Sequence, residues 1–139
     1  FIPWLDAQHL DELYSTSDGM FLSSRLDPLP NVALDALSFG VPVVCFARAS
    51  GLVECLEEYE ALRHIIAPYL DVRGAVDIIV MLIQDSQLKE VVQKDISQLM
   101  TKTFRIKSYV NRILELKDVV AERHALSCQK LKLFWSLEL

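Results

Sequence analysis

Short apolar segments alternate with amphipathic segments in the first part of the chain, and this order constrains the fold most strongly. Residues 19–22 and 41–46 are short, hydrophobic runs, and the second is rich in β-branched valine. Between them, a segment from Pro30 or Asn31 to Gly40 carries valine, leucine and alanine at helical spacing. Strands that alternate with helices form buried parallel sheets through crossover connections. The sequence therefore predicts an α/β fold, a Rossmann-like parallel sheet flanked by helices.

The rest of the chain extends this pattern and ends in helices. Asp6 is placed to cap a helix over residues 7–14, and Asp71 is placed to cap a helix over Val72–Gln84. Shorter elements are expected as strands at residues 1–4 and 63–67, loops at 23–30 and 47–51, and a helix at 52–58. After Asp85 only helical spacing remains, at residues 86–101 and from about 109 to 120.

Length and composition suit one domain with a separate tail. We expect residues 1–120 to form the domain and residues 121–139 to form a C-terminal tail. The hydrophobic residues of the tail fit a helix face and also fit an extended segment, so both stay open. It also stays open whether the tail packs against the domain or contacts an absent domain or partner. The chain begins in mid-pattern without a methionine, so we expect a fragment of a longer protein.

Charge and cysteine content exclude several classes of function. The net charge of −5 gives no basic surplus for nucleic acid, which binds through Lys and Arg at its phosphates. Three scattered cysteines form no zinc or CxxC pattern and suit a reducing cytosol. The longest apolar run, residues 78–83, is far below the ~20 residues of a membrane span. We therefore expect a cytoplasmic protein and leave peripheral membrane association of the longer protein open.

A strand, a turn and a helix N-terminus follow one another between residues 24 and 37. Parallel sheets bind ligands at the carboxyl ends of their strands, and a helix N-terminus attracts phosphate through its free N–H groups. Pro28 and Pro30 lack an N–H group. The remaining candidate donors are the backbone N–H groups of Leu29, Asn31, Val32 and Ala33. This unit is a candidate cradle for a diphosphate.

Two carboxylates stand eight positions apart around this cradle, Asp27 in the turn and Asp35 about one turn into the helix. A carboxylate accepts hydrogen bonds well from paired sugar hydroxyls. Each residue also has a structural explanation, since aspartate before proline suits a turn and a first-turn aspartate is stabilised by the helix dipole. Arg48, which follows a strand, is favoured as a solvated surface charge, and the three histidines are scattered.

The order of these motifs resembles family 4 glycosyltransferases, which carry two glutamates in an E-x₇-E arrangement before Gly-x-Pro-Val-Val. The matching stretches are Ser-Ser-Arg-Leu-Asp27-Pro-Leu-Pro and Asp35-Ala-Leu-Ser-Phe-Gly40-Val-Pro42-Val-Val. Flanking stretches also match in order, namely Tyr14-Ser-Thr-Ser-Asp18-Gly-Met-Phe-Leu, Ser50-Gly51-Leu-Val-Glu54 and His64-Ile-Ile-Ala-Pro-Tyr-Leu-Asp71. The resemblance covers roughly residues 1–120.

The resemblance implies the C-terminal, donor-binding half of a GT-B fold in a retaining enzyme of polysaccharide biosynthesis. Its substrate would be a nucleotide-diphospho-sugar, bound without a metal or other cofactor, and a missing N-terminal domain would bind a sugar or lipid-linked acceptor. By position, Asp27 would face the donor sugar as the catalytic residue, and Asp35 would hold the ribose hydroxyls. The diphosphate would meet the backbone of Leu29, Pro30, Asn31 and Val32, with Glu54 nearby. Arg25 would reach a phosphate or pair with Asp27.

One departure from the family pattern keeps a second function open. Both motif glutamates are aspartates here, and each is one methylene shorter, so each reaches roughly 1.5 Å less. That difference is enough to weaken or redirect a hydrogen bond. The alternative is a non-catalytic, glycosyltransferase-like domain kept for binding or assembly. Another GT-B enzyme, such as a sugar epimerase, ranks below both because those enzymes lack the E-x₇-E arrangement.

Overall fold

The computed structural model describes the backbone of residues 4–136 and the side chains of residues 4–117 and 119–124. The chain divides into two compact units, Phe1–Lys102 (unit 1) and Thr103–Leu139 (unit 2). Unit 1 holds all the strands of the described residues, and the described part of unit 2 holds one helix. The strand expected at residues 1–4 lies outside the described residues except for Trp4, which belongs to no regular element.

Three parallel strands form the sheet of unit 1 in the order β1-β2-β3. They are β1 (Met20–Leu22), β2 (Val43–Phe46) and β3 (Ile66–Ala67). In the register, Met20 lies opposite Val43 and Cys45 lies opposite Ile66. All four residues of β2 are buried, because this strand is central and both faces of the sheet are covered. The predicted Rossmann-like parallel sheet with flanking helices is confirmed.

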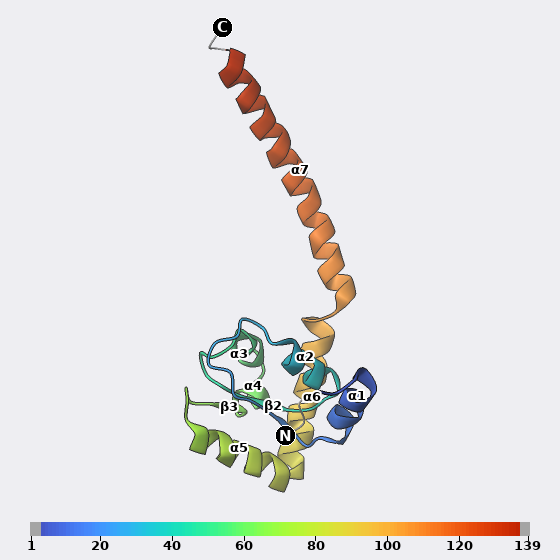
Figure 1. Ribbon diagram of the computed structural model, residues 1–139, viewed down its shortest axis with the longest axis vertical. Helices are drawn as coiled ribbons and strands as arrows, with labels where there is room; N and C mark the ends of the chain where they lie inside the picture. The colour runs from blue at the N-terminus through green and yellow to red at the C-terminus, as the bar shows by residue number, and fades with distance from the viewer. Residues whose placement is uncertain (1–3, 137–139) are drawn as a thin grey trace. The chain divides into compact units, whose positions relative to one another are not determined.

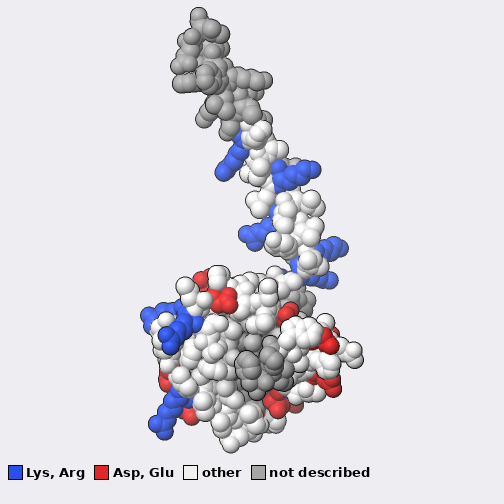
Figure 2. Space-filling model, viewed as in Figure 1, with Lys and Arg blue, Asp and Glu red and all other residues white. Residues whose placement is uncertain are grey.

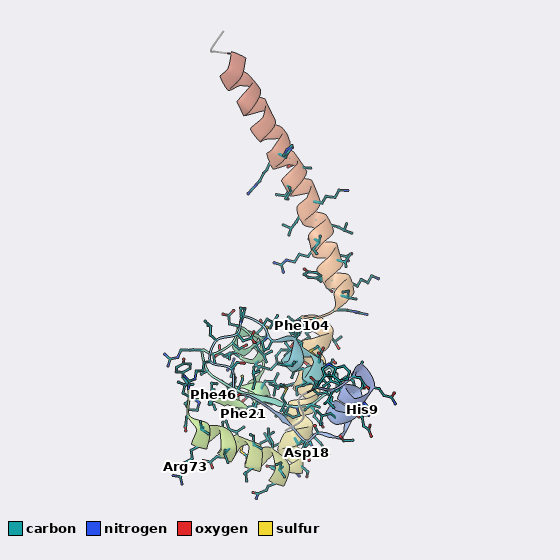
Figure 3. All side chains as sticks on the ribbon, viewed as in Figure 1. His9, Asp18, Phe21, Phe46, Arg73 and Phe104 are labelled. Atoms are coloured by element: carbon teal, nitrogen blue, oxygen red, sulfur yellow. The ribbon has the colours of Figure 1, made fainter. Side chains whose placement is uncertain are left out.

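Helices cover both faces of this sheet (Figure 1). One face is covered by α5 (Val72–Gln84), and the other by α2 (Asn31–Ser38) and α3 (Leu52–Leu56). On the α5 side, Phe21 and Phe46 lie edge to face with ring centroids 5.5 Å apart (Figure 3). Such a pair adds about 0.5–1.5 kcal/mol to the area that it buries. It joins β1 to β2 on the face that receives α5.

A long helix, α6 (Ser86–Lys102), packs against α2, α4 (Glu60–Arg63) and α5 and completes the core of unit 1. Its buried residues are Val92, Ile96 and Leu99, which recur every three or four positions. This spacing places them on one face of the helix. The Lys89 ammonium also bonds the Asp18 carboxylate at 2.6 Å, which ties α6 to the turn before β1.

Both predicted aspartate caps are present. The Asp6 carboxylate accepts a hydrogen bond from the backbone N–H of His9 at 2.9 Å and begins α1 (Ala7–Thr16). The same bond is the main cause of the lowered pKa of Asp6. The Asp71 carboxylate accepts from the N–H of Gly74 at 3.0 Å and begins α5. Gly40 lies two residues after the end of α2 and has φ +75°, a conformation that glycine adopts without the strain of a side chain.

The expected strand at residues 63–67 is only partly correct. A short helix, α4 (Glu60–Arg63), occupies its first residue, and β3 covers only its last two. Arg63 belongs to the helix because its backbone N–H bonds the Tyr59 carbonyl at 3.2 Å and its Nε bonds the Glu57 carbonyl at 2.7 Å. The helix expected at residues 52–58 is likewise shorter, since α3 ends at Leu56.

The described part of unit 2 is a single helix, α7 (Ile106–Ser136). The tail is therefore helical as far as Ser136, and the extended alternative is not realised there. The predicted division of the protein into domains at residue 120 stays a prediction. None of the helices, over the residues that the structure describes, is long and apolar enough to cross a membrane.

The position of Leu99 predicts how strongly α6 stabilises unit 1. Replacing this fully buried side chain by alanine removes apolar contacts and leaves a cavity, so Leu99→Ala should lower the free energy of unfolding by about 2–5 kcal/mol. Urea denaturation followed by circular dichroism measures the change. The control is Lys94→Ala, an exposed position on the same helix, which should stay within about 0.5 kcal/mol. Equal midpoints for the two variants would contradict the packing of α6.

Candidate functional site

The loops that follow β1 and β2 are hydrogen-bonded to each other. The backbone N–H of Asp27 donates to the Ala49 carbonyl at 3.0 Å, and the N–H of Gly51 donates to the Asp27 carbonyl at 3.3 Å. Together they form a parallel bridge between Asp27 and Ser50. Both loops leave the carboxyl ends of neighbouring parallel strands, which is the usual ligand-binding edge of such sheets. The bridge therefore fixes Asp27 at that edge.

Gly51 allows the two loops to approach closely. A Cβ atom added at this position would lie 2.1 Å from the carbonyl oxygen of Pro28. That distance is too short for non-bonded atoms, and the contact is with backbone, which a side-chain rotation cannot relieve. Gly51 is also the residue before α3. A residue without a side chain is therefore required where α3 starts.

A cavity of about 470 Å³ lies between these two loops and α3. Its charged lining consists of Asp27, Arg48, Glu54 and Glu57. Asp27 is half-buried, whereas Arg48 and Glu54 are exposed. Two predicted site residues, Asp27 and Glu54, are thus brought together although 27 positions separate them in the sequence. Carboxylates accept hydrogen bonds from hydroxyl groups, and the guanidinium can bind an anion.

Asp35 lies on α2 and is not part of the cavity lining. Its carboxylate is exposed and stands near Tyr14, whose hydroxyl donates to the Val32 carbonyl at 3.2 Å. Burial raises the pKa of Tyr14, and the negative charge of Asp35 raises it further. The structure therefore separates the two motif aspartates, with Asp27 in the cavity and Asp35 outside it.

The N-terminus of α2 offers free donors between these two carboxylates. Pro30 precedes the helix and makes no side-chain cap, while its carbonyl accepts from Ala33 at 3.1 Å and Leu34 at 3.2 Å. Within the described residues, nothing accepts a hydrogen bond from the backbone N–H of Asn31 or Val32. Free N–H groups and the helix dipole give this end a partial positive charge. It is a suitable place for an anion.

Two further predicted residues lie at the rim of this region. Leu29, two residues before α2, is 40% exposed. Arg25 is exposed and does not line the cavity. Both Arg25 and Asp27 are described, and no ion pair joins them. Of the two alternatives for Arg25, the pairing with Asp27 is not realised, and the phosphate contact stays a prediction.

Comparison with known protein families finds one match. A family model described as Glycosyl transferases group 1 matches residues 1–98. The chain belongs to this family. The match covers the whole sheet, both site loops and most of α6, so the fold and the transfer of glycosyl groups in general are those of the group 1 glycosyl transferases. No curated protein and no solved structure matches the chain.

The sequence did not predict a site role for Arg48, which lines the cavity. Arg48 is the second residue after β2, and its φ of 61° is left-handed. Leu70, three residues after β3, is also left-handed, with φ 59°. The left-handed conformation costs a non-glycine residue roughly 1–2 kcal/mol, and such strain is concentrated at functional sites. The guanidinium carbon of Arg48 lies 5.4 Å from the centroid of the Tyr69 ring. A cation–π contact therefore orients Arg48 beside the cavity.

No group of three histidine, cysteine, aspartate or glutamate side chains with metal-binding geometry occurs among the described residues. Of the cysteines, Cys45 is buried in β2, and burial raises its pKa to about 11. Burial also raises the pKa of Cys55, with smaller contributions from Glu58 and Glu54. Neither thiol lines the cavity. The metal-independent mechanism stays a prediction for this glycosyl transferase.

The contact between Gly51 and Pro28 leads to a prediction about the integrity of the site. Gly51→Ala places a methyl group against the Pro28 carbonyl and should lower the free energy of unfolding by about 1–3 kcal/mol. The matched control is Gly19→Ala, whose Cβ would meet the Pro42 carbonyl at an ordinary 3.6 Å. Thermal unfolding of both variants measures the difference. An unchanged midpoint for Gly51→Ala would mean that the two loops are not held as described.

Proposed function

We propose that this chain is the donor-binding, C-terminal domain of a retaining GT-B glycosyltransferase of the family 4 type. It would bind a nucleotide-diphospho-sugar, and the full enzyme would transfer a hexosyl group to a sugar or lipid-linked acceptor. The observation that carries the proposal is the cavity at the carboxyl ends of β1 and β2, which combines Asp27, Glu54 and Arg48. The family match over residues 1–98 supports glycosyl transfer in general.

Asp27 is the residue that we assign to the donor sugar. Its backbone is hydrogen-bonded on both sides, by its N–H to Ala49 and by its carbonyl to Gly51, so its side chain leaves a fixed position. A carboxylate on a fixed backbone position recognises hydroxyl groups at a smaller ordering cost than one on a mobile loop. Glu54 lines the same cavity and supplies a second acceptor. Two carboxylates suit a ligand that presents several hydroxyl groups.

The diphosphate requires positive charge, and two features supply it in this proposal. The first is the open N-terminus of α2, where the N–H groups of Asn31 and Val32 have no partner within the described residues. The second is Arg48, whose planar guanidinium can hold two phosphate oxygens at once. Together they would take the place that a divalent cation occupies in metal-dependent transferases.

Asp35 is the residue that we assign to the ribose hydroxyls. It is exposed and lies about one turn beyond the free N–H groups of α2, on the same helix. A ligand whose diphosphate rests on the helix N-terminus would therefore extend its sugar toward Asp27 and its nucleoside toward Asp35. An N-terminal domain would then complete the enzyme by binding the acceptor, and these 139 residues alone would bind donor without transferring it.

A binding or assembly domain without catalysis is the second candidate, because aspartate stands at both motif positions and reaches roughly 1.5 Å less than glutamate. The two candidates differ in what a longer side chain does. In the catalytic case Asp27→Glu in the full-length protein would retain or raise the rate of transfer. In the binding case it would leave the full-length protein without transferase activity.

The role of Asp35 predicts the affinity for nucleotides. Isothermal titration of the chain with UDP, GDP and ADP should reveal one preferred nucleotide, and Asp35→Ala should weaken its binding at least about tenfold, or 1.4 kcal/mol. Asp11→Ala is the matched control, since Asp11 is an exposed carboxylate on α1. Binding that Asp35→Ala and Asp11→Ala leave equally strong would remove Asp35 from the site. Absence of binding by all three nucleotides would count against the donor-domain proposal.

The role of Asp27 predicts a different pattern, because its carboxylate is assigned to the sugar and not to the nucleotide. Asp27→Ala should weaken the binding of the matching nucleotide-sugar by about tenfold and leave the affinity for the free nucleoside diphosphate within twofold. Competition titrations with both ligands on one protein sample measure the ratio. An equal loss for the two ligands would show that Asp27 holds the nucleotide or the loop itself.

A further inference from the structure

The helix α1 has a single buried side chain. All ten residues of α1 are described, and among them Tyr14 alone is buried, with 8% of its surface exposed. Its neighbours in the chain, Leu13 and Ser15, are both exposed. The contacts of Tyr14 therefore decide which part of unit 1 is joined most firmly to α1.

Tyr14 contacts α2 near both of its ends. The hydroxyl donates to the carbonyl of Val32, in the first turn of α2, at 3.2 Å. The ring lies against the ring of Phe39, the residue directly after α2, with centroids 5.6 Å apart and an angle of 33° between the planes. A helix of eight residues is about 12 Å long, so these two contacts span most of its length. Tyr14 thus sets the position of α2 relative to α1.

The first turn of α2 depends on the Tyr14 hydroxyl more than the rest of the helix does. Packing holds the middle of α2, where Ala33, Ala36 and Leu37 are buried. The N-terminus has no side-chain cap, because Pro30 precedes it. Within the described residues, the bond from Tyr14 is the one hydrogen bond that a side chain makes to the first turn of α2.

The surface of α1 does not suit direct contact with a nucleotide. The helix contains Asp11 and Glu12 and no lysine or arginine. Figure 2 shows the result at the right of unit 1, where the charged side chains in view over α1 are Asp and Glu. Carboxylates repel phosphates, and the Tyr14 hydroxyl is already bonded to Val32. Any effect of Tyr14 on a bound nucleotide therefore passes through α2.

We propose that Tyr14 is a positioning residue of the donor site, which holds the first turn of α2 in the orientation that a nucleoside diphosphate requires. The inference rests on the proposed function, in which Asn31 and Val32 donate to the diphosphate and Asp35 binds the ribose. Tyr14 holds the carbonyl of Val32, the same residue whose N–H has no partner within the described residues. Hydrogen bonds weaken steeply when donor and acceptor are misaligned, so a small rotation of this turn lowers affinity.

The surroundings of Tyr14 keep its hydroxyl in the form that donates. Burial raises the pKa of Tyr14, and the negative charge of Asp35 raises it further. The hydroxyl therefore stays protonated over the ordinary pH range, and its bond to the Val32 carbonyl persists there. Asp35, which we assign to the ribose, thus also supports the residue that positions its own helix.

The variant Tyr14→Phe tests the proposal, because it removes the hydroxyl and keeps the ring that packs against Phe39. In isothermal titration of the full 139-residue chain, it should weaken binding of the preferred nucleoside diphosphate about fivefold. The matched control is Tyr59→Phe, which should bind within twofold of the wild type. The Tyr59 hydroxyl makes no hydrogen bond within the described residues, and its ring contact with Lys102 remains.

Double variants separate positioning from a general effect on the fold. In the Asp35→Ala background, Tyr14→Phe should weaken binding of the nucleoside diphosphate by no more than about twofold, because one of the two contacts that it orients is already absent. In the Asp27→Ala background the loss should stay about fivefold, since Asp27 lies on a loop that Tyr14 does not contact. The same loss in both backgrounds would overturn the proposal, because it would show that Tyr14 acts without regard to α2.

Nuclear magnetic resonance spectra without nucleotide provide a second readout. Tyr14→Phe should shift the amide signals of residues 31–34 and leave those of Asp27 and Gly51 in place, which also confirms that the variant is folded. Unchanged signals in the first turn of α2, or wild-type affinity in Tyr14→Phe, would overturn this inference alone. A wild-type chain that binds no nucleoside diphosphate would overturn the proposed function and this inference with it.

Discussion

The backbone bridge between Asp27 and Ser50 is the contact on which the candidate site depends. Two parallel strands deliver two loops to the same edge of the sheet, but loops are mobile unless their backbone groups are bonded. Here the N–H and the carbonyl of Asp27 are both bonded to the second loop, at 3.0 and 3.3 Å. The cavity exists because these loops run side by side, and Gly51 permits that approach by lacking a side chain.

The cavity combines opposite charges that serve different parts of one ligand. Asp27 and Glu54 accept hydrogen bonds, and Arg48 donates them. Arg48 has a left-handed backbone and contacts the ring of Tyr69, so one orientation of its side chain is favoured before a ligand arrives. Strain of this kind is tolerated where the surrounding structure stabilises it. A donor with hydroxyl groups at one end and phosphates at the other matches this arrangement.

Local sequence signals predicted most of the fold because the forces behind them are local. The caps at Asp6 and Asp71 depend on a side chain and an N–H group three residues away, and both were correct. The burial of β2 follows from its own run of apolar residues. In contrast, α4 was not predicted, and the expected strand began too early, at Arg63. The hydrogen bonds from Arg63 to Tyr59 and Glu57 place this residue in the helix.

The site was predicted only in part, because only some of its residues are marked by local sequence signals. Asp27 and Glu54 belong to motifs with fixed spacing, whereas Arg48 acquires its place from Tyr69, which follows a different strand 21 positions later. A single sequence does not reveal such a contact, and a lone arginine after a strand is more often a surface charge. The separation of Asp35 from the cavity also depends on how α2 packs against Tyr14, which spacing alone does not express.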